Sequence, residues 1–165
     1  MADTSAQHSA EEWVVSHFLP RHFKGISFRG RKLTVKWGGQ FAFDAVSDDG
    51  KIVGLISTSA SRTASGKAAI AKYQKLKADA LYLLNVIGAK QLFMIFTEES
   101  MLSHFEKERQ SGRFPPEIAL LHASLPEKIH VHVLGARRAA SIETSPKGKR
   151  KGSNQRLQRT GCARR

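Results

Sequence analysis

Cysteine and long apolar runs are both scarce in this chain of 165 residues. Its single cysteine, Cys162, excludes an internal disulfide and a zinc site built from several cysteines. No run of eighteen apolar residues occurs, so no segment is expected to span a membrane as a helix. The first ten residues are polar and lack the apolar stretch of a signal peptide. We therefore expect an intracellular, cytoplasmic protein without a membrane partner.

Acidic residues are also few, with 14 Asp and Glu against 27 Lys and Arg and a formal net charge of +13. The excess is concentrated in residues 137–165, where ten basic residues and one acid give +9. That segment has almost nothing apolar to bury, so we expect a disordered basic arm. Contacts with several phosphates would give it salt-sensitive affinity for nucleic acid, DNA more than RNA. The predicted contact residues are Arg137, Arg138, Lys147, Lys149, Arg150, Lys151, Arg156 and Arg159.

The apolar pattern predicts one α/β domain with a mixed sheet over residues 9–136, after a flexible N-terminus of residues 1–8. Ser9 and Glu12 form a capping-box pattern that predicts a helix over 10–19. The elements expected next are a meander of strands over 31–37, 41–46 and 52–58, a helix over 66–87, a buried strand over 91–97, a helix over 98–111, a short helix after Pro116 and a strand over 129–134.

The hairpin between the second and third strands has the clearest signal, because Asp49-Gly50 is typical of a two-residue turn. Counting outward from that turn gives these pairs: Val46 with Val53, Ala45 with Gly54, and Asp44 with Leu55. An Asp within a strand is uncommon and costly to bury without a partner. Asp44 is therefore the first candidate for a functional residue. The alternative is a structural carboxylate that bonds to Ser57 or to the backbone.

Asp44 and this order of elements resemble the PD-(D/E)XK, or restriction-endonuclease-like, nuclease superfamily. The resemblance extends from residue 10 to about residue 135. It implies carboxylates that hold Mg²⁺ and a Lys that stabilises charge on a phosphodiester during cleavage. In that family, the second acid and the Lys lie on the strand beside the Asp, where this chain has Leu55 and Ser57. Two of the three expected catalytic side chains are therefore missing.

The resemblance also implies where replacements could lie. Family members often add a metal-binding Glu on the first helix, which contains Glu12, and some carry a migrated Lys at the start of the long helix, as Lys67 is here. A relocated catalytic site would contain Asp44, Glu12 and Lys67 near Ser57, with Asp44 and Glu12 as the Mg²⁺ ligands. In the plainer interpretation, Glu12 belongs to the capping box and Lys67 is a solvated lysine.

Three functions stay open at this point, and they differ in whether the chain is an enzyme. We favour a nucleic-acid-binding protein whose nuclease-like fold cleaves weakly or not at all, because Leu55 and Ser57 replace the catalytic pair. The first alternative is an active Mg²⁺-dependent endonuclease with relocated residues. The second is a non-enzymatic α/β interaction protein whose basic tail only increases solubility.

Overall fold

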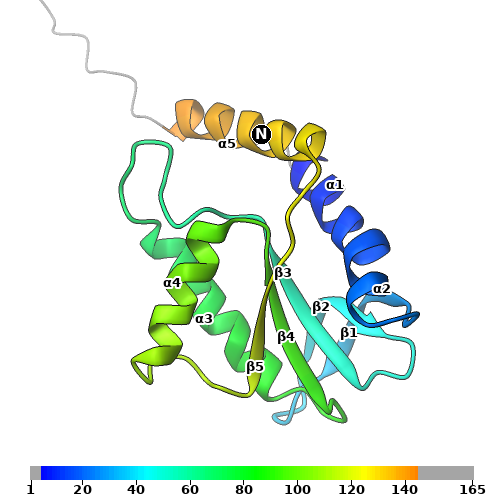
Figure 1. The fold of residues 1–165 in the computed structure, drawn as a ribbon. Helices are drawn as coiled ribbons and strands as arrows, with labels where there is room; N and C mark the ends of the chain where they lie inside the picture. Colours follow the sequence, from blue (N-terminus) through cyan, green and yellow to red (C-terminus); the bar gives the residue numbers. More distant parts are fainter. Residues whose placement is uncertain (1–4, 145–165) are drawn as a thin grey trace, which may run out of the picture.

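A five-stranded mixed sheet organises the computed structural model, which describes residues 5–144 and the side chains of residues 5–140 (Figure 1). The strands lie in the order β1-β2-β3-β4-β5; β1 to β3 are antiparallel, and β4 and β5 continue parallel to β3. The predicted α/β class and antiparallel meander are confirmed. In chain order the elements are α1 (Ser5–Trp13), the π-helix η1 (Val14–Phe18), α2 (Leu19–His22), β1 (Phe28–Thr34), β2 (Gln40–Ser47), β3 (Ile52–Ser57), α3 (Ile70–Leu84), β4 (Gln91–Phe96), α4 (Glu99–Gln110), β5 (Ile118–His122) and α5 (Glu127–Thr144).

Helices cover both faces of the sheet, as Figure 1 shows. On the face of α3 and α4, the core includes Leu55, Met94 and Phe96. On the face of α1, η1 and α2, it includes Ile56, Phe93 and Ile95. Consecutive residues of β3 and β4 thus enter opposite cores, which explains why the central strands read as unbroken apolar runs.

The first helical segment begins before the predicted cap. α1 starts at Ser5, so Ser9 lies inside the helix, and the helix includes residues 5–8 of the expected flexible N-terminus. Ala6 and Ala10 are fully buried against Val133 of α5. Packing between these two helices therefore extends α1 beyond the start that the capping box indicated. Residues 1–4 lie outside the described residues.

The last two elements have types opposite to those predicted. The expected short helix is strand β5, which pairs in parallel with β4, and the expected strand over 129–134 is part of helix α5. In a strand, Val131 and Val133 would share a face, yet Val131 is 60% exposed and Val133 is fully buried. The spacing of Ile129, Val133 and Ala136, which pack together with α1, is helical.

α5 also changes the boundary of the basic arm. The helix continues through Arg137 and Arg138 to Thr144, so it includes residues 137–144 of the expected basic arm. The part of the predicted arm that remains, residues 145–165, lies outside the described residues. Among the helices that the structure describes, none is long and apolar enough to cross a membrane.

Candidate functional site

A β-bulge places Asp44 at the end of regular pairing within the sheet. Between Arg29 and Arg31, β1 advances by two residues while its partner β2 advances by three. Two residues of β2, Asp44 and Ala45, therefore lie opposite the single residue Gly30 of β1. Because a bulge bends its strand and disrupts the local ladder, β2 turns away from its regular course at this point.

The β2–β3 hairpin confirms the predicted register, but only as far as the bulge. Its ladder consists of Val46 opposite Val53 and Ala45 opposite Gly54. Asp44 does not continue the ladder to Leu55. Instead, the backbone N–H of Ile56 donates a 2.8 Å hydrogen bond to Oδ2 of Asp44. The Asp44 carboxylate thus accepts the hydrogen bond of a β3 backbone N–H at the point where the pairing of β2 with β3 ends.

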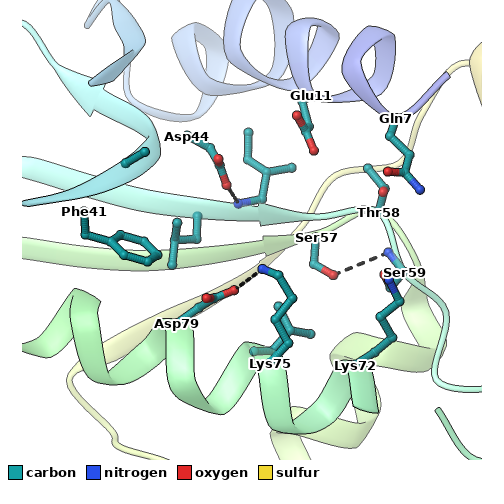
Figure 2. Close-up of a pocket in the computed structure, with 14 residues that line it drawn as sticks. Gln7, Glu11, Phe41, Asp44, Ser57, Thr58, Ser59, Lys72, Lys75 and Asp79 are labelled. Carbon is teal, nitrogen blue, oxygen red and sulfur yellow. Dashed lines mark hydrogen bonds and ion pairs between the residues drawn. The ribbon is translucent and has the colours of Figure 1, made fainter. Parts of the chain in front are cut away.

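Asp44 lines a cavity of about 200 Å³ beside the end of β3, which we call the Asp44 cavity (Figure 2). Figure 2 shows Glu11 and Lys75 reaching toward β3 from opposite sides, Glu11 from α1 and Lys75 from α3. The polar wall of the cavity is contributed by α1 (Gln7 and Glu11), β2 (Asp44), the end of β3 and the loop after it (Ser57, Thr58 and Ser59), and α3 (Lys72, Lys75 and Asp79).

Two carboxylates in the Asp44 cavity are harder to ionise than usual. Burial raises the pKa of Asp44, outweighing the Ile56 N–H and the Lys75 charge, which lower it. Burial and the negative charge of Asp44 raise the pKa of Glu11, against the lowering effects of His8 and Lys75. A divalent cation between Asp44 and Glu11 would offset both their burial and their repulsion. The pair is therefore suited to a metal ion.

Carboxylate oxygens are ligands of the type that Mg²⁺ takes. In proteins, Mg²⁺ is commonly held by one or two carboxylates together with water and substrate phosphate. Among the side chains of residues 5–140, no group of three or more His, Cys, Asp and Glu could hold a metal ion by itself. Asp44 and Glu11 would contribute two ligands, because the Ile56 bond uses Oδ2 of Asp44 and leaves Oδ1 for another partner.

The structure brings together only part of the predicted site. Asp44 and Ser57 both line the Asp44 cavity. Glu12 is exposed and lines a separate groove between α1 and the β1–β2 strands, which it shares with Glu11 and Asp44. Lys67 is exposed in the loop before α3 and lies outside the wall of the Asp44 cavity. Glu11 and Lys75 thus line the Asp44 cavity, whereas Glu12 and Lys67 do not.

The helical phase of α1 explains why Glu11, and not Glu12, lines the Asp44 cavity. Ala6, Ala10 and Val14 are fully buried at a regular spacing of four residues. Gln7 and Glu11 each come one residue after a buried alanine, so both lie at the border of the buried stripe and line the Asp44 cavity. The sequence contains this four-residue spacing, whereas the resemblance indicates only a Glu on the first helix and does not distinguish Glu11 from Glu12.

The helical phase of α3 likewise explains the position of the lysines. Lys72, Lys75 and Asp79 are three and four residues apart, which places them on one side of the helix. The Lys75 ammonium lies 2.5 Å from Oδ2 of Asp79, whose side chain is only 13% exposed. Asp79 therefore holds Lys75 at the rim of the Asp44 cavity. Lys67 precedes the first turn of α3 and cannot share this face.

Arg137, a predicted nucleic-acid contact, is engaged within the protein. Its guanidinium donates to the carbonyl oxygen of Thr58 and lies 2.9 Å from Oε1 of Glu98. His130 lies 3.4 Å from the same carboxylate oxygen. Arg138 is exposed on α5 and stays available for an external partner. The other predicted contacts lie outside the described residues: Lys147, Lys149, Arg150, Lys151, Arg156 and Arg159.

Comparison of the chain with protein-family models, with curated proteins and with solved structures finds no match. The class that the structure defines is an α/β protein with a five-stranded mixed sheet. Any functional conclusion must therefore come from the Asp44 cavity and from the order of the elements around it.

Proposed function

We propose that the chain is a Mg²⁺-dependent phosphodiesterase of nucleic acid with a restriction-endonuclease-like core. The observation that carries this proposal is the convergence of Glu11, Asp44 and Lys75, from three elements, on one cavity where the β2–β3 hairpin parts. The order of elements supports the resemblance, since a helix, an antiparallel meander and a long helix precede a buried parallel strand.

Each of the three residues has a distinct role in the proposed chemistry. Asp44 and Glu11 would hold Mg²⁺, which supplies an activated water and polarises the phosphate when bound. Lys75 carries the positive charge that stabilises the additional negative charge on the phosphate during cleavage. Asp79 positions Lys75 through their 2.5 Å ion pair. Lys72, which lines the same cavity, is placed to attract the nucleic-acid backbone.

Binding without efficient cleavage is the second candidate, and two observations favour it. The Asp44 carboxylate already accepts a hydrogen bond from Ile56, which is a structural use of that group. Leu55 and Ser57 line the cavity where the resemblance places an acid and a Lys. In this case Lys72, Lys75 and the basic C-terminal segment would bind phosphates, and hydrolysis would be slow.

The test is cleavage of supercoiled plasmid, single-stranded DNA and RNA by the full chain in Mg²⁺ or Mn²⁺. Glu11→Gln and Glu12→Gln form a matched pair, because they remove the same charge from adjacent residues and only Glu11 lines the Asp44 cavity. We expect Glu11→Gln to lower the cleavage rate by about 100-fold or more, because it removes one of the two anionic ligands of the ion that would stabilise the charge of the transition state. Glu12→Gln should leave the rate unchanged.

Each outcome of this experiment has a separate meaning. If Glu12→Gln is the variant that loses activity, the ligand lies on the groove side and the assignment of Glu11 is wrong. Activity that survives both substitutions contradicts the proposed carboxylate pair. If the wild-type chain binds all three nucleic acids and cuts none of them, binding without cleavage is the function.

A further inference from the structure

A second polar cavity lies on the far side of the loop that follows β3. It has a volume of about 270 Å³ and no Asp or Glu among the described residues that line it. We call it the Arg62 cavity. Its wall is formed by the loop (Ser61, Arg62 and Ala68), by Tyr73 of α3 and by one side of α4 (Ser100, Ser103, His104 and Lys107).

The α4 side of the Arg62 cavity is a regular polar stripe. Ser100, Ser103, His104 and Lys107 are spaced by three, one and three residues, so they share one face of the helix. Met101 and Phe105 are fully buried on another face. The polar stripe does not simply face solvent, since the His104 ring stacks on Tyr73 with centroids 3.8 Å apart. This arrangement encloses polar groups between two helices and a loop.

Internal hydrogen bonds use only some of these polar groups. Ser61 anchors the loop, because its N–H donates to Oγ of Ser100 at 3.2 Å and its carbonyl accepts from the Tyr73 hydroxyl. Arg62 donates from Nη1 to the carbonyl of Gly66 at 2.8 Å, which leaves most of its donors unused. The ion pairs found within residues 5–140 do not include the Lys107 ammonium. The cavity therefore presents two cationic groups without a carboxylate to neutralise them.

We propose that the Arg62 cavity binds a second phosphate of the nucleic-acid backbone. This inference rests on the proposed function and extends it to the path of the substrate strand. Arg62 and Lys107 provide the positive charge, and the Ser103 hydroxyl provides a neutral donor. A phosphate is the matching ligand because the cavity combines cations and hydroxyls.

The two cavities are close along the chain, which supports one continuous strand path. Thr58 and Ser59 line the Asp44 cavity, and Ser61 and Arg62 line the Arg62 cavity. On α3, the adjacent residues Lys72 and Tyr73 are likewise divided between the two. A strand that crosses the loop after β3 would thus place one phosphate in each cavity. The second contact would fix the direction in which the strand enters the Asp44 cavity.

His104 provides a direct readout of an anion in the Arg62 cavity. Burial lowers the pKa of His104; Glu108 raises it, while Lys77, Arg113 and Lys107 lower it further. A phosphate bound beside the ring adds a negative charge and would raise the pKa of His104. The ring signals of His104 can be followed by NMR through a pH titration, with and without inorganic phosphate.

The experiment uses the full chain and two probes, inorganic phosphate and a fluorescein-labelled single-stranded oligonucleotide. We expect phosphate to raise the pKa of His104 in the wild type and not in Lys107→Ala. Arg62→Ala and Lys107→Ala should each weaken oligonucleotide binding and reduce the log–log salt slope by about 0.7, the loss of one phosphate contact with a single strand. The matched control is Lys90→Ala, an exposed lysine outside both cavities.

An unchanged salt slope in both variants overturns the inference, as does a His104 pKa that phosphate does not move. Phosphate binding without any effect of the variants on the oligonucleotide overturns the assignment to nucleic acid. Neither measurement depends on cleavage. If the slope falls in Lys107→Ala but no cleavage occurs, the phosphodiesterase proposal fails and the second phosphate site stands. Cleavage that depends on Glu11, with unaltered slopes, refutes the second site alone.

Discussion

A buried glutamate on α4 and the two carboxylates of the Asp44 cavity, on β2 and α1, have opposite electrostatic surroundings. Glu108 lies 2.5 Å from the Lys77 ammonium and 2.9 Å from the Arg113 guanidinium. Hydrogen bonds from these two cations lower the pKa of Glu108 to about 2. In the Asp44 cavity, burial raises the pKa of Asp44 and, with the Asp44 charge, that of Glu11.

The contrast separates two uses of charged carboxylates in one protein. Glu108 is satisfied by the protein itself, so its charge joins α3 to α4 and needs nothing from outside. Asp44 and Glu11 carry charges that the protein compensates incompletely, so their ionised forms would gain from a cation. Carboxylates whose pKa is raised in a cavity are candidates for function, whereas those in complete ion-pair networks are structural. The following predictions test this distinction.

The largest expected effect is that of Asp44→Asn on cleavage. We expect a loss of about 100-fold or more, because Asn cannot supply an anionic metal ligand. Stability should be kept or increased, since Asn keeps an oxygen for the Ile56 N–H and removes an unfavourably buried charge. Plasmid nicking and urea unfolding measure the two effects. A large loss of stability would make Asp44 a structural residue like Glu108.

A smaller loss of activity is expected from Lys75→Gln. Removing the cation near the scissile phosphate should lower the cleavage rate by roughly tenfold to 100-fold, which is at or below the smallest rate losses typical for groups that stabilise transition-state charge. The matched control is Lys67→Gln, which removes the same charge from the exposed loop before α3. Single-turnover cleavage by the two variants decides between the helix position and the sequence-based assignment. Loss in Lys67→Gln alone would restore the original prediction.

The third prediction concerns stability. Glu108→Gln should lower the melting temperature, because Lys77 and Arg113 then lose their shared anionic partner. The rate of cleavage below the melting transition should be unaffected, since Glu108 lies outside both cavities. Differential scanning calorimetry and nicking assays check these outcomes. An unchanged melting temperature would show that the ion pairs of Glu108 contribute little to the contact between α3 and α4.

The smallest effect is the pH dependence of these stability differences. The pKa of Glu108 is lowered from 4.5 to about 2, so its stabilising effect is complete above 4.5 and is lost as the pH falls toward 2. The pKa values of Asp44 and Glu11 are raised, so their ionisation opposes folding at neutral pH, and protonation removes that penalty as the pH falls. Urea unfolding from pH 7 to 2 measures both effects on the free energy of unfolding. As the pH falls, the stability advantage of the wild type over Glu108→Gln should shrink, and the stability penalty of the wild type relative to Asp44→Asn should shrink as well.

Local chemistry explains why the hairpin register was predictable. Gly50 has a φ of 70°, as the turn signal requires. The turn itself differs in detail: the Gly50 N–H donates to the Ser47 carbonyl, so Asp48 and Asp49 are its central residues. Asp49 also accepts bonds from the Ser47 hydroxyl and the Lys51 N–H. All of these contacts fall within residues 47–51, so a short sequence window contains them.

The bulge was not predictable by the same means. Asp44 leaves the hairpin ladder because β2 is one residue longer than β1 in the segment they share, and β1 lies more than ten residues earlier in the chain. No local pattern at Asp44 encodes that mismatch. Counting from the turn therefore placed Asp44 opposite Leu55, whereas its carboxylate contacts the Ile56 N–H. Short apolar runs such as 118–121 are equally ambiguous, because pairing with β4 decides their type.

The Asp44 cavity depends on the one additional residue of β2, and therefore on a single codon of the gene. A gene without the codon for Asp44 or Ala45 would encode strands of matching length, whose pairing could continue past the present break. Without Asp44, the N–H of Ile56 would lose its carboxylate acceptor, and the Asp44 cavity would lose one of its carboxylates. A lineage could therefore gain or lose this site through a single in-frame insertion or deletion.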